Sequence, residues 1–400
     1  MLSDDDYIEA GYTLENKDRE GRRNELTIQS GIKDKEVAQG QINGIINYSD
    51  GSDLDYSLTS QAKDQYNANL NRNALYFKSL VKPQDDISIV FGVRYVDLKQ
   101  SVEQFKVEQN LVTIENSALN FTKTLPSASL KYSIDDDNQL RFAYTETFVY
   151  PDFREFINSE FIHPVFLAKV AGNPDLVETD IQSYDIRYDH YFNKLDSINM
   201  SLFYKHMDNP IEDTTEFTTS TLDKFSFDNA KAADLMGIEL SFAKNLEFVS
   251  HYLDRVSFSG NYTYLQSEIS LTAEQKNKYV TQERGLQGLS PEVINLSLTY
   301  NETDVRTVNL SYNKMSERLM RVALKNGDVV LGLDDYEVPP QLLDFTWIEK
   351  FHSDTLESDM DLTVKVKNLL DGETVWKQGE LTTLKYKTGT SFSMTLNAKF

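Results

Sequence analysis

The sequence has no cysteine, no long hydrophobic run and few basic residues. The absence of cysteine from 400 residues excludes a disulfide framework, thiolate metal sites and a cysteine nucleophile. No stretch approaches the roughly 18 consecutive apolar residues that a membrane-spanning helix requires, and the mean hydropathy is −0.48. A helical membrane protein is therefore excluded. A membrane β-barrel is not, because alternate residues of each spanning strand face a polar lumen.

Acidic residues outnumber basic ones, 63 to 40, which gives a formal net charge of −23 at pH 7. Nucleic-acid binding is disfavoured, since it depends on basic patches that displace phosphate counterions. The start of the chain, residues 1–6, has neither the basic nor the apolar region of a secretory signal. The sequence therefore predicts that export is specified upstream of this chain, or that the protein stays inside the cell.

The last ten residues alternate strictly between polar and apolar side chains. The apolar positions are Phe392, Met394, Leu396, Ala398 and Phe400. Such a pattern predicts a β-strand with one apolar and one polar face. An aromatic final residue on the apolar face is typical of a strand that closes a lipid-facing barrel.

The same alternation recurs backward along the chain and predicts about fifteen strands, an all-β, antiparallel, up-and-down transmembrane barrel. Short connections are expected near 82–86, 135–138, 193–196, 301–304 and 352–358, and long ones near 98–124, 148–180, 207–234, 267–289, 315–340 and 369–389. Short turns at one rim and long loops at the other are the layout of outer-membrane barrels. With an odd strand count, the first strand runs parallel to the last, and the chain begins inside a long loop.

Several stretches, in order along the chain, resemble the barrel of TonB-dependent outer-membrane receptors. They are Phe91-Gly92-Val93-Arg94-Tyr95, Gly172-Asn173-Pro174-Asp175-Leu176, Asn209-Pro210-Ile211-Glu212, Gly237-Ile238-Glu239-Leu240, Arg284 to Pro291, and Val364 to Asp371 with the strand that ends at Phe400. The resemblance implies a member of that family. One departure is Tyr150, where the related pattern commonly has arginine before Pro151, so no contact of that arginine is carried over.

The resemblance also indicates what the chain lacks. Family barrels have about 22 strands and an N-terminal plug, and nothing in residues 1–400 resembles the plug. We therefore expect one domain, residues 1–400, which forms the carboxy-terminal part of an N-terminally incomplete barrel. About seven strands and the plug would lie upstream.

The function that the resemblance implies is active uptake across the outer membrane of a Gram-negative bacterium. The nutrient would be a scarce one, such as siderophore-bound iron, cobalamin, an oligosaccharide or a peptide. The implied partners are the TonB-ExbB-ExbD system, acting through the missing plug, outer-membrane lipids and lipopolysaccharide, and the barrel-assembly machinery. That machinery would read the apolar positions of the last strand, 392 to 400, as an assembly signal. A passive porin-like channel and a surface ligand-binding protein or adhesin without transport are the alternatives.

Candidate ligand-binding residues lie in the long connection 148–180 and on lumen-facing strand positions. They are Tyr150, Asp152, Phe153, Arg154, Glu155, Asn173, Arg141 and Arg187. Loop aromatics stack on sugars, catechols or corrins, but they equally belong to an aromatic girdle or pack loop against loop. The 172–176 motif has the Gly and Asn-Pro of a turn, and lumen arginines equally line a polar interior.

Enzymatic chemistry finds no support in the sequence. The five histidines are far apart and lack metal-ligand spacing, and the chain has no nucleophile elbow, Walker loop or dinucleotide fingerprint. We therefore expect no catalytic residues, no metal site and no cofactor.

Overall fold

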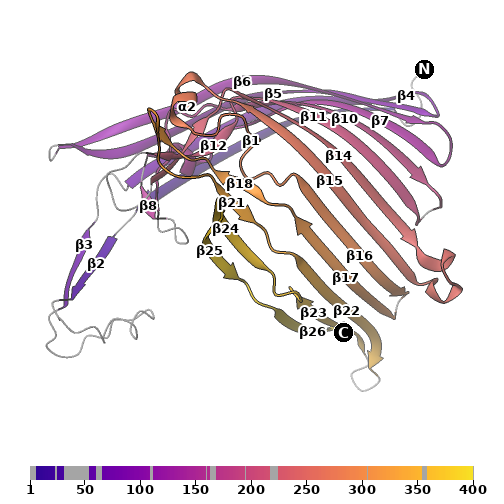
Figure 1. Cartoon of the computed structure of the whole chain (residues 1–400). Coiled ribbons are helices and arrows are strands. Elements are labelled where there is room, and N and C mark those ends of the chain that lie inside the picture. Colours follow the sequence, from indigo (N-terminus) through magenta and orange to yellow (C-terminus); the bar gives the residue numbers. More distant parts are fainter. Residues whose placement is uncertain are drawn as a thin grey trace.

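The computed structural model describes residues 6–22, 25–30, 54–59, 65–108, 111–158, 160–162, 168–193, 195–216, 224–303, 305–353 and 358–399. Fourteen antiparallel strands form one large curved sheet, in which neighbours in the sheet follow one another along the chain (Figure 1). The sheet strands are β1 (Tyr7–Arg22), β4 (Gln65–Gln84), β5 (Ile87–Glu108), β6 (Leu111–Ser133), β7 (Asn138–Val149), β10 (Thr179–Tyr191), β11 (Ser197–Asp208), β14 (Ala232–Asn245), β15 (Val256–Ser270), β16 (Glu292–Glu302), β17 (Arg306–Met315), β22 (Leu342–Ser353), β23 (Ser358–Lys367) and β26 (Ser391–Lys399).

The remaining elements lie in the connections between these strands. They are β2 (Glu25–Ser30), β3 (Leu54–Thr59), α1 (Phe153–Phe156), β8 (Phe161–Ile162), β9 (Lys169–Val170), β12 (Ile211–Glu216), β13 (Lys224–Asn229), η2 (Leu246–Phe248), η3 (His251–Leu253), α2 (Ala273–Lys278), β18 (Arg318–Arg321), β19 (Lys325–Asn326), β20 (Val329–Val330), β21 (Asp335–Val338), β24 (Glu373–Gln378) and β25 (Leu381–Lys387). Among the described residues, none of the helices has the length and apolar character needed to cross a bilayer.

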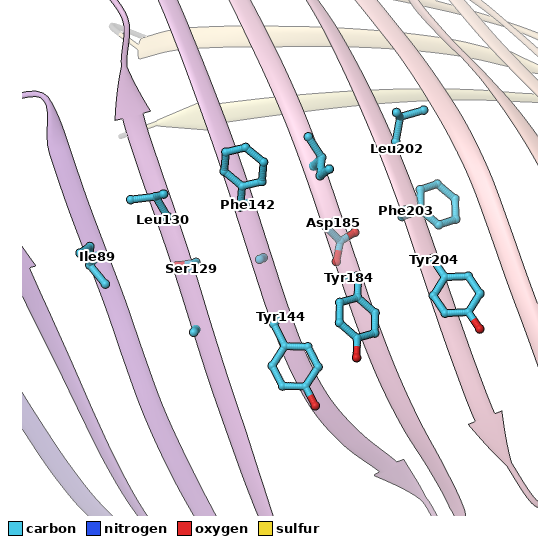
Figure 2. Close-up of a pocket in the computed structure, with 13 residues that line it drawn as sticks. Ile89, Ser129, Leu130, Phe142, Tyr144, Tyr184, Asp185, Leu202, Phe203 and Tyr204 are labelled. Atoms are coloured by element: carbon cyan, nitrogen blue, oxygen red, sulfur yellow. The ribbon is translucent and has the colours of Figure 1, made fainter.

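The alternating pattern places apolar side chains on the outer, convex face of the sheet. In β11, Met200, Leu202 and Tyr204 are exposed on this face. The strand register places apolar side chains of the neighbouring strands on this face as well, because Leu202 lies opposite Ile186 and Ile186 lies opposite Phe142. Figure 2 shows the result, a shallow apolar hollow in which the rings of Tyr144, Tyr184 and Tyr204 lie side by side on one face. The predicted apolar face of an all-β, barrel-type wall is thus confirmed.

The last strand follows the same rule. Phe392, Met394 and Leu396 of β26 are 68%, 65% and 54% exposed, and β26 pairs with β23 over its whole length. Phe400 lies outside the described residues. An apolar row open to the surroundings fits a strand that contacts lipid.

Short and long connections alternate as the sequence predicts, with one correction. Residues 98–124 do not form a loop, since β5 and β6 stay paired from Ile87 and Tyr132 to Glu108 and Leu111. Polar and apolar residues still alternate in this segment, but here the apolar ones lie on the inner face. Val96, Leu98 and Val102 are buried on the inner face, so the outer side becomes polar and the segment no longer looks like a lipid-facing strand.

The direction of the first strand also differs from expectation. The described residues give the sheet fourteen strands where about fifteen are expected, and with this even number β1 and β26 run in opposite directions. The backbone NH of Lys82, near the β4–β5 turn, donates to Asp6 Oδ1 at 2.7 Å. The first described residue therefore lies at the short-turn edge and not in a long loop.

The long connections form further sheets with one another. One four-stranded sheet has the order β12-β13-β9-β8, and another has the order β18-β21-β24-β25. Each combines strands from two different connections. A buried cluster that includes Ala230, Tyr279 and Leu319 packs three connections together. In Figure 1, β8 and β12 lie within the hollow of the curved sheet.

Candidate functional site

The two lumen arginines that the sequence predicts lie side by side on the inner face of the sheet. Arg187 of β10 is directly opposite Arg141 of β7, an arrangement that like charges alone would destabilise. Asp189 offsets the repulsion. Its fully buried carboxylate accepts from Arg187 Nε at 2.7 Å, and Arg141 Nε is 3.3 Å from its second oxygen. Both guanidinium groups remain partly exposed toward the lumen.

The loop candidates are held by the short helix α1. Asp152 caps this helix, because its side chain accepts a hydrogen bond from the backbone NH of Arg154 at 3.0 Å. In turn, the backbone NH of Asp152 donates to the side chain of Glu155 at 2.9 Å. Such a capping box satisfies NH groups that a helix start leaves without partners. Burial raises the pKa of the Glu155 carboxyl. Asp152 and Glu155 thus shape the backbone here.

The aromatic side chains of this connection point into the wall. Phe153 is 3% and Phe156 1% exposed, and both pack against inner-face residues such as Leu70 and Leu98. Tyr150 is half-buried beside Phe148, and burial raises the pKa of its hydroxyl. The connection therefore folds inward against β4 and β5 and narrows the space beneath the sheet.

Arg154 and Asp152 are the accessible groups of this connection. Its guanidinium lies over the ring of Phe161, 4.2 Å from the centroid, at a distance typical of cation–π contacts. The carboxylate of Asp152 is 3.9 Å from Arg19 of β1 and is more than half exposed. These two groups are open to a ligand, whereas Phe153 is enclosed.

Asn173 and Gly172 clamp the connection to α1. The backbone NH of Gly172 donates to Ile157 O at 2.9 Å, and that of Asn173 donates to Glu155 O at 2.6 Å. The side chain of Asn173 also donates to Phe227 O of β13 at 3.0 Å. The Gly-Asn-Pro motif therefore joins two connections.

Alanine at position 172 is expected to destabilise this connection by about 1–3 kcal/mol, the usual range for overpacking. A Cβ there would lie 2.5 Å from both Glu155 O and Ile157 O, and backbone oxygens in a turn cannot move aside cheaply. Limited proteolysis should cut Gly172→Ala faster within 150–178. Gly332→Ala is the matched control, since its Cβ meets nothing within 4 Å. Equal cutting rates for both variants would contradict the expectation.

Sequence reasoning missed a buried ion pair that joins two other connections. Arg284, between β15 and β16, donates through Nη1 and Nη2 to Glu212 of β12 at 3.1 and 2.7 Å. Their side chains are 3% and 10% exposed. Glu212 also accepts from the backbone NH of Gln287 at 3.0 Å. Both residues belong to stretches that carry the family resemblance, but no local pattern shows that the two stretches meet.

A second contact that sequence reasoning missed joins the two four-stranded sheets. The guanidinium of Arg321 lies between two rings, 4.3 Å from the centroid of Phe225 in β13 and 5.2 Å from that of Trp376 in β24. Asp335 is 3.1 Å from its Nε. Four long connections are therefore linked through two arginines, 284 and 321.

The inner wall has a charged zone and a neutral zone. Arg141, Arg187 and Asp189 form part of the first. On β15 to β17, Asn295 donates to Asn261 at 2.7 Å, and Asn313 donates to Asn295 at 2.6 Å, in a ladder of side-chain amides. The wall can thus contact a polar ligand or protein segment through both charges and neutral amides.

Comparison with known proteins agrees with this architecture. Residues 4–369 match the family described as TonB dependent receptor-like, beta-barrel. No curated protein sequence matches the chain.

Three solved receptors share the fold. The ferric-catecholate import receptor Fiu from E. coli K12 aligns with a TM-score of 0.59 and 15% identity, over 86% of this chain and 46% of the receptor. The ferric citrate transporter FecA gives 0.55 and 14%, over 80% and 45%. The ferric yersiniabactin uptake receptor FyuA from Yersinia pestis gives 0.52 and 16%, over 86% and 47%. The chain thus spans less than half the length of each receptor.

The family match covers most of the chain, and the sheet with its apolar outer face and long connections at one edge agrees with it. The chain belongs to the TonB-dependent receptor β-barrel family.

Proposed function

We propose that this chain forms barrel wall and extracellular connections of an outer-membrane receptor that takes up a scarce nutrient with energy from TonB. The observation that supports this most is the sheet itself. Over most of its strands the outer face is apolar and the inner face is polar, and its long connections are joined into a canopy at one edge. The canopy is defined here as the two four-stranded sheets with α1 and α2.

The proposed nutrient classes are siderophore-bound iron, cobalamin, an oligosaccharide or a peptide. Within the chain, Asp152 and Arg154 would contact the ligand at the canopy, and Arg141 and Arg187 would contact it or a plug at the wall, because these four side chains are accessible. Tyr150, Phe153, Glu155 and Asn173 would act by holding the canopy in shape. No catalytic residue, metal or cofactor is proposed.

The proposed partners follow from the same assignment. TonB, with ExbB and ExbD, would act through a plug. The barrel-assembly machinery would read the apolar row of β26, and lipid would cover the outer face. A passive channel or an adhesin would share the wall but would not need energy coupling.

Growth on a single limiting nutrient tests the proposal in the native host. Deleting the gene is expected to abolish high-affinity uptake of one nutrient class, and loss of TonB should abolish it equally. Uptake that survives loss of TonB would identify a passive channel. Unchanged uptake with weaker ligand binding at the cell surface would identify an adhesin, and either result overturns the proposal.

A further inference from the structure

The neutral amides of the inner wall lie on one line of register through five strands. Asn199 of β11 lies opposite Ser241 of β14, and Ser241 lies opposite Asn261 of β15. The line continues through Asn295 of β16 to Asn313 of β17. Every side chain on this line both donates and accepts hydrogen bonds. The line therefore forms a continuous, uncharged polar row on the inner face.

Two further rows of the same character run beside the first, toward the short-turn edge. They are Ser197–Ala243–Ser259–Ser297–Ser311 and Asn245–Ser257–Thr299–Asn309–Thr346. The neutral zone is defined here as these three rows. Charged residues make up 26% of the chain, but the neutral zone has none, and apart from Ala243 every side chain in it is Ser, Thr or Asn.

The row next to the neutral zone on the canopy side is of the opposite kind. Lys131 lies opposite Arg141, and Arg141 lies opposite Arg187. The same row continues through Ser201 to Glu239. Charge on the inner face therefore changes between one row and the next, and the absence of charge is a property of the neutral zone and not of the whole inner face.

The neutral zone crosses the wall from one edge to the other. It starts at the short turn before β11, since Ser197 is the first residue of that strand. On β17 it ends at Asn313, two residues before the strand ends at Met315 and the long connection begins. A row of register climbs the wall from strand to strand, because barrel strands are tilted by about 35–45°, and the strands in Figure 1 are inclined in this way. The neutral zone thus connects the short-turn edge with the canopy.

The side chains of the neutral zone are bonded to one another and still accessible. Besides the ladder from Asn313 to Asn261, Asn309 donates to Ser297 Oγ at 2.6 Å and to Thr299 Oγ1 at 2.8 Å. Within the described structure, no side-chain atom of the neutral zone is buried without a hydrogen-bond partner. Each residue is half-buried. A hydroxyl group of a ligand can therefore replace one of these bonds at a small net cost, because one hydrogen bond is exchanged for another.

This chemistry selects among ligands. Asn261, Asn295 and Ser297, with other residues of the first two rows, line a shallow hollow of about 440 Å³. An anionic chelate meets no cation in the neutral zone, and a large planar ring meets no aromatic side chain. A neutral molecule rich in hydroxyl groups meets a donor and an acceptor at nearly every position. Passage also requires contacts that are favourable enough to admit a solute and weak enough to release it, as exchangeable hydrogen bonds are.

We propose that the neutral zone is the surface along which the transported ligand passes through the lumen, and that this ligand is a neutral oligosaccharide. This inference rests on the proposed function and narrows its nutrient class. The edge-to-edge course of the zone fits a path. The bonds within the zone favour a passing ligand over a protein segment held there permanently, because side chains that serve a fixed partner would be left without hydrogen bonds when it is absent.

Uptake from a defined mixture tests the ligand class. Cells of the native host, a strain without the gene and a strain without TonB receive neutral oligosaccharides of glucose, mannose, galactose and xylose together with a ferric catecholate, cyanocobalamin and a peptide digest. Mass spectrometry follows the removal of each compound from the medium. Removal of a neutral oligosaccharide is expected to be lost in both mutant strains. Loss for the chelate, cobalamin or peptides alone would overturn the ligand class and leave the proposed function standing, whereas no loss for any compound would refute the proposed function.

Two variants test the path itself. Asn261→Ala/Asn295→Ala/Asn313→Ala is expected to lower the uptake rate of the oligosaccharide about tenfold per folded receptor, because several hydrogen bonds are lost at once. Binding of the same sugar at the cell surface should stay unchanged, since the canopy is intact. Ser297→Arg places a bulky charge in the neutral zone without removing the ladder, and it should lower the rate as well.

The matched control removes three asparagines from the opposite face of the sheet. Asn67→Ala/Asn69→Ala/Asn71→Ala alters β4 on the side away from the buried Leu70, and it should transport at the wild-type rate. Wild-type uptake by both neutral-zone variants overturns the proposal. Entry of vancomycin into the triple neutral-zone variant without TonB also overturns it, because such a leak would show that the zone holds a plug in place.

Discussion

Replacing Arg284 by alanine is expected to weaken the attachment of the β15–β16 connection to β12 by about 3–5 kcal/mol, because it leaves the Glu212 carboxylate buried and unpaired. The pair is bidentate and nearly inaccessible to water. Hydrogen exchange at the backbone amides of Leu286 and Gln287 should therefore accelerate about a hundredfold or more, since each 1.4 kcal/mol corresponds to a factor of ten.

Two further variants separate the causes. Lys377→Ala removes an exposed pair, Lys377 to Glu317 at 3.5 Å, and should change local stability by no more than about 1 kcal/mol. The double variant Arg284→Leu/Glu212→Leu should recover much of the loss, because apolar replacements of both partners leave no buried charge. Exchange in Arg284→Ala within about threefold of the wild type would show that this ion pair does not hold the two connections together.

An arginine on the outer face should be costly, whereas the same residue one position away should not. Leu202 lies in the middle of the apolar part of β11 and lines the hollow in Figure 2. Leu202→Arg is expected to lower the free energy of unfolding by about 2–4 kcal/mol, the range for arginine at the bilayer midplane of a barrel. The folded protein in the outer membrane should fall accordingly.

Ser201→Arg is the matched control for that prediction. Ser201 points to the inner face, opposite both Arg187 and Glu239, so a new guanidinium meets water there, and the carboxylate of Glu239 offsets the like charge of Arg187. Its effect should stay within about 1 kcal/mol. Urea unfolding of the extracted receptor and the amount assembled in the membrane measure both variants. Similar losses for the two would show that the outer face is not lipid-facing.

Most of the wall could be predicted from the sequence, because its signal is local. In a strand with one apolar and one polar face, the polarity of each residue indicates the face on which it lies, as for Met200, Ser201 and Leu202. The inward position of Arg141 and Arg187 follows from the same alternation of polar and apolar residues. The buried Asp189 that joins them does not, since it depends on side-chain positions across two strands.

The sequence expectation and the structure differ where the surroundings of a strand change. Above the apolar band, the canopy covers the inner face, so Leu98 and Val102 turn inward while Lys99 and Ser101 face outward. The alternation persists, but the apolar side chains lie on the inner face, and for this reason the sequence predicts a long connection at 98–124 where the structure has two paired strands. The sequence predicts about fifteen strands and the described residues give fourteen, and this difference in parity is why the direction of β1 differs from the expected one.

The sequence by itself determined the all-β class, the two faces of the wall, the alternation of short and long connections and the resemblance to a family. These depend on the polarity of neighbouring residues. Only the tertiary structure decided which connections meet, because the pairing of Arg284 with Glu212 and the contact of Arg321 with Phe225 and Trp376 join residues far apart in the chain. Such contacts are set by strand register and packing, which no local pattern contains.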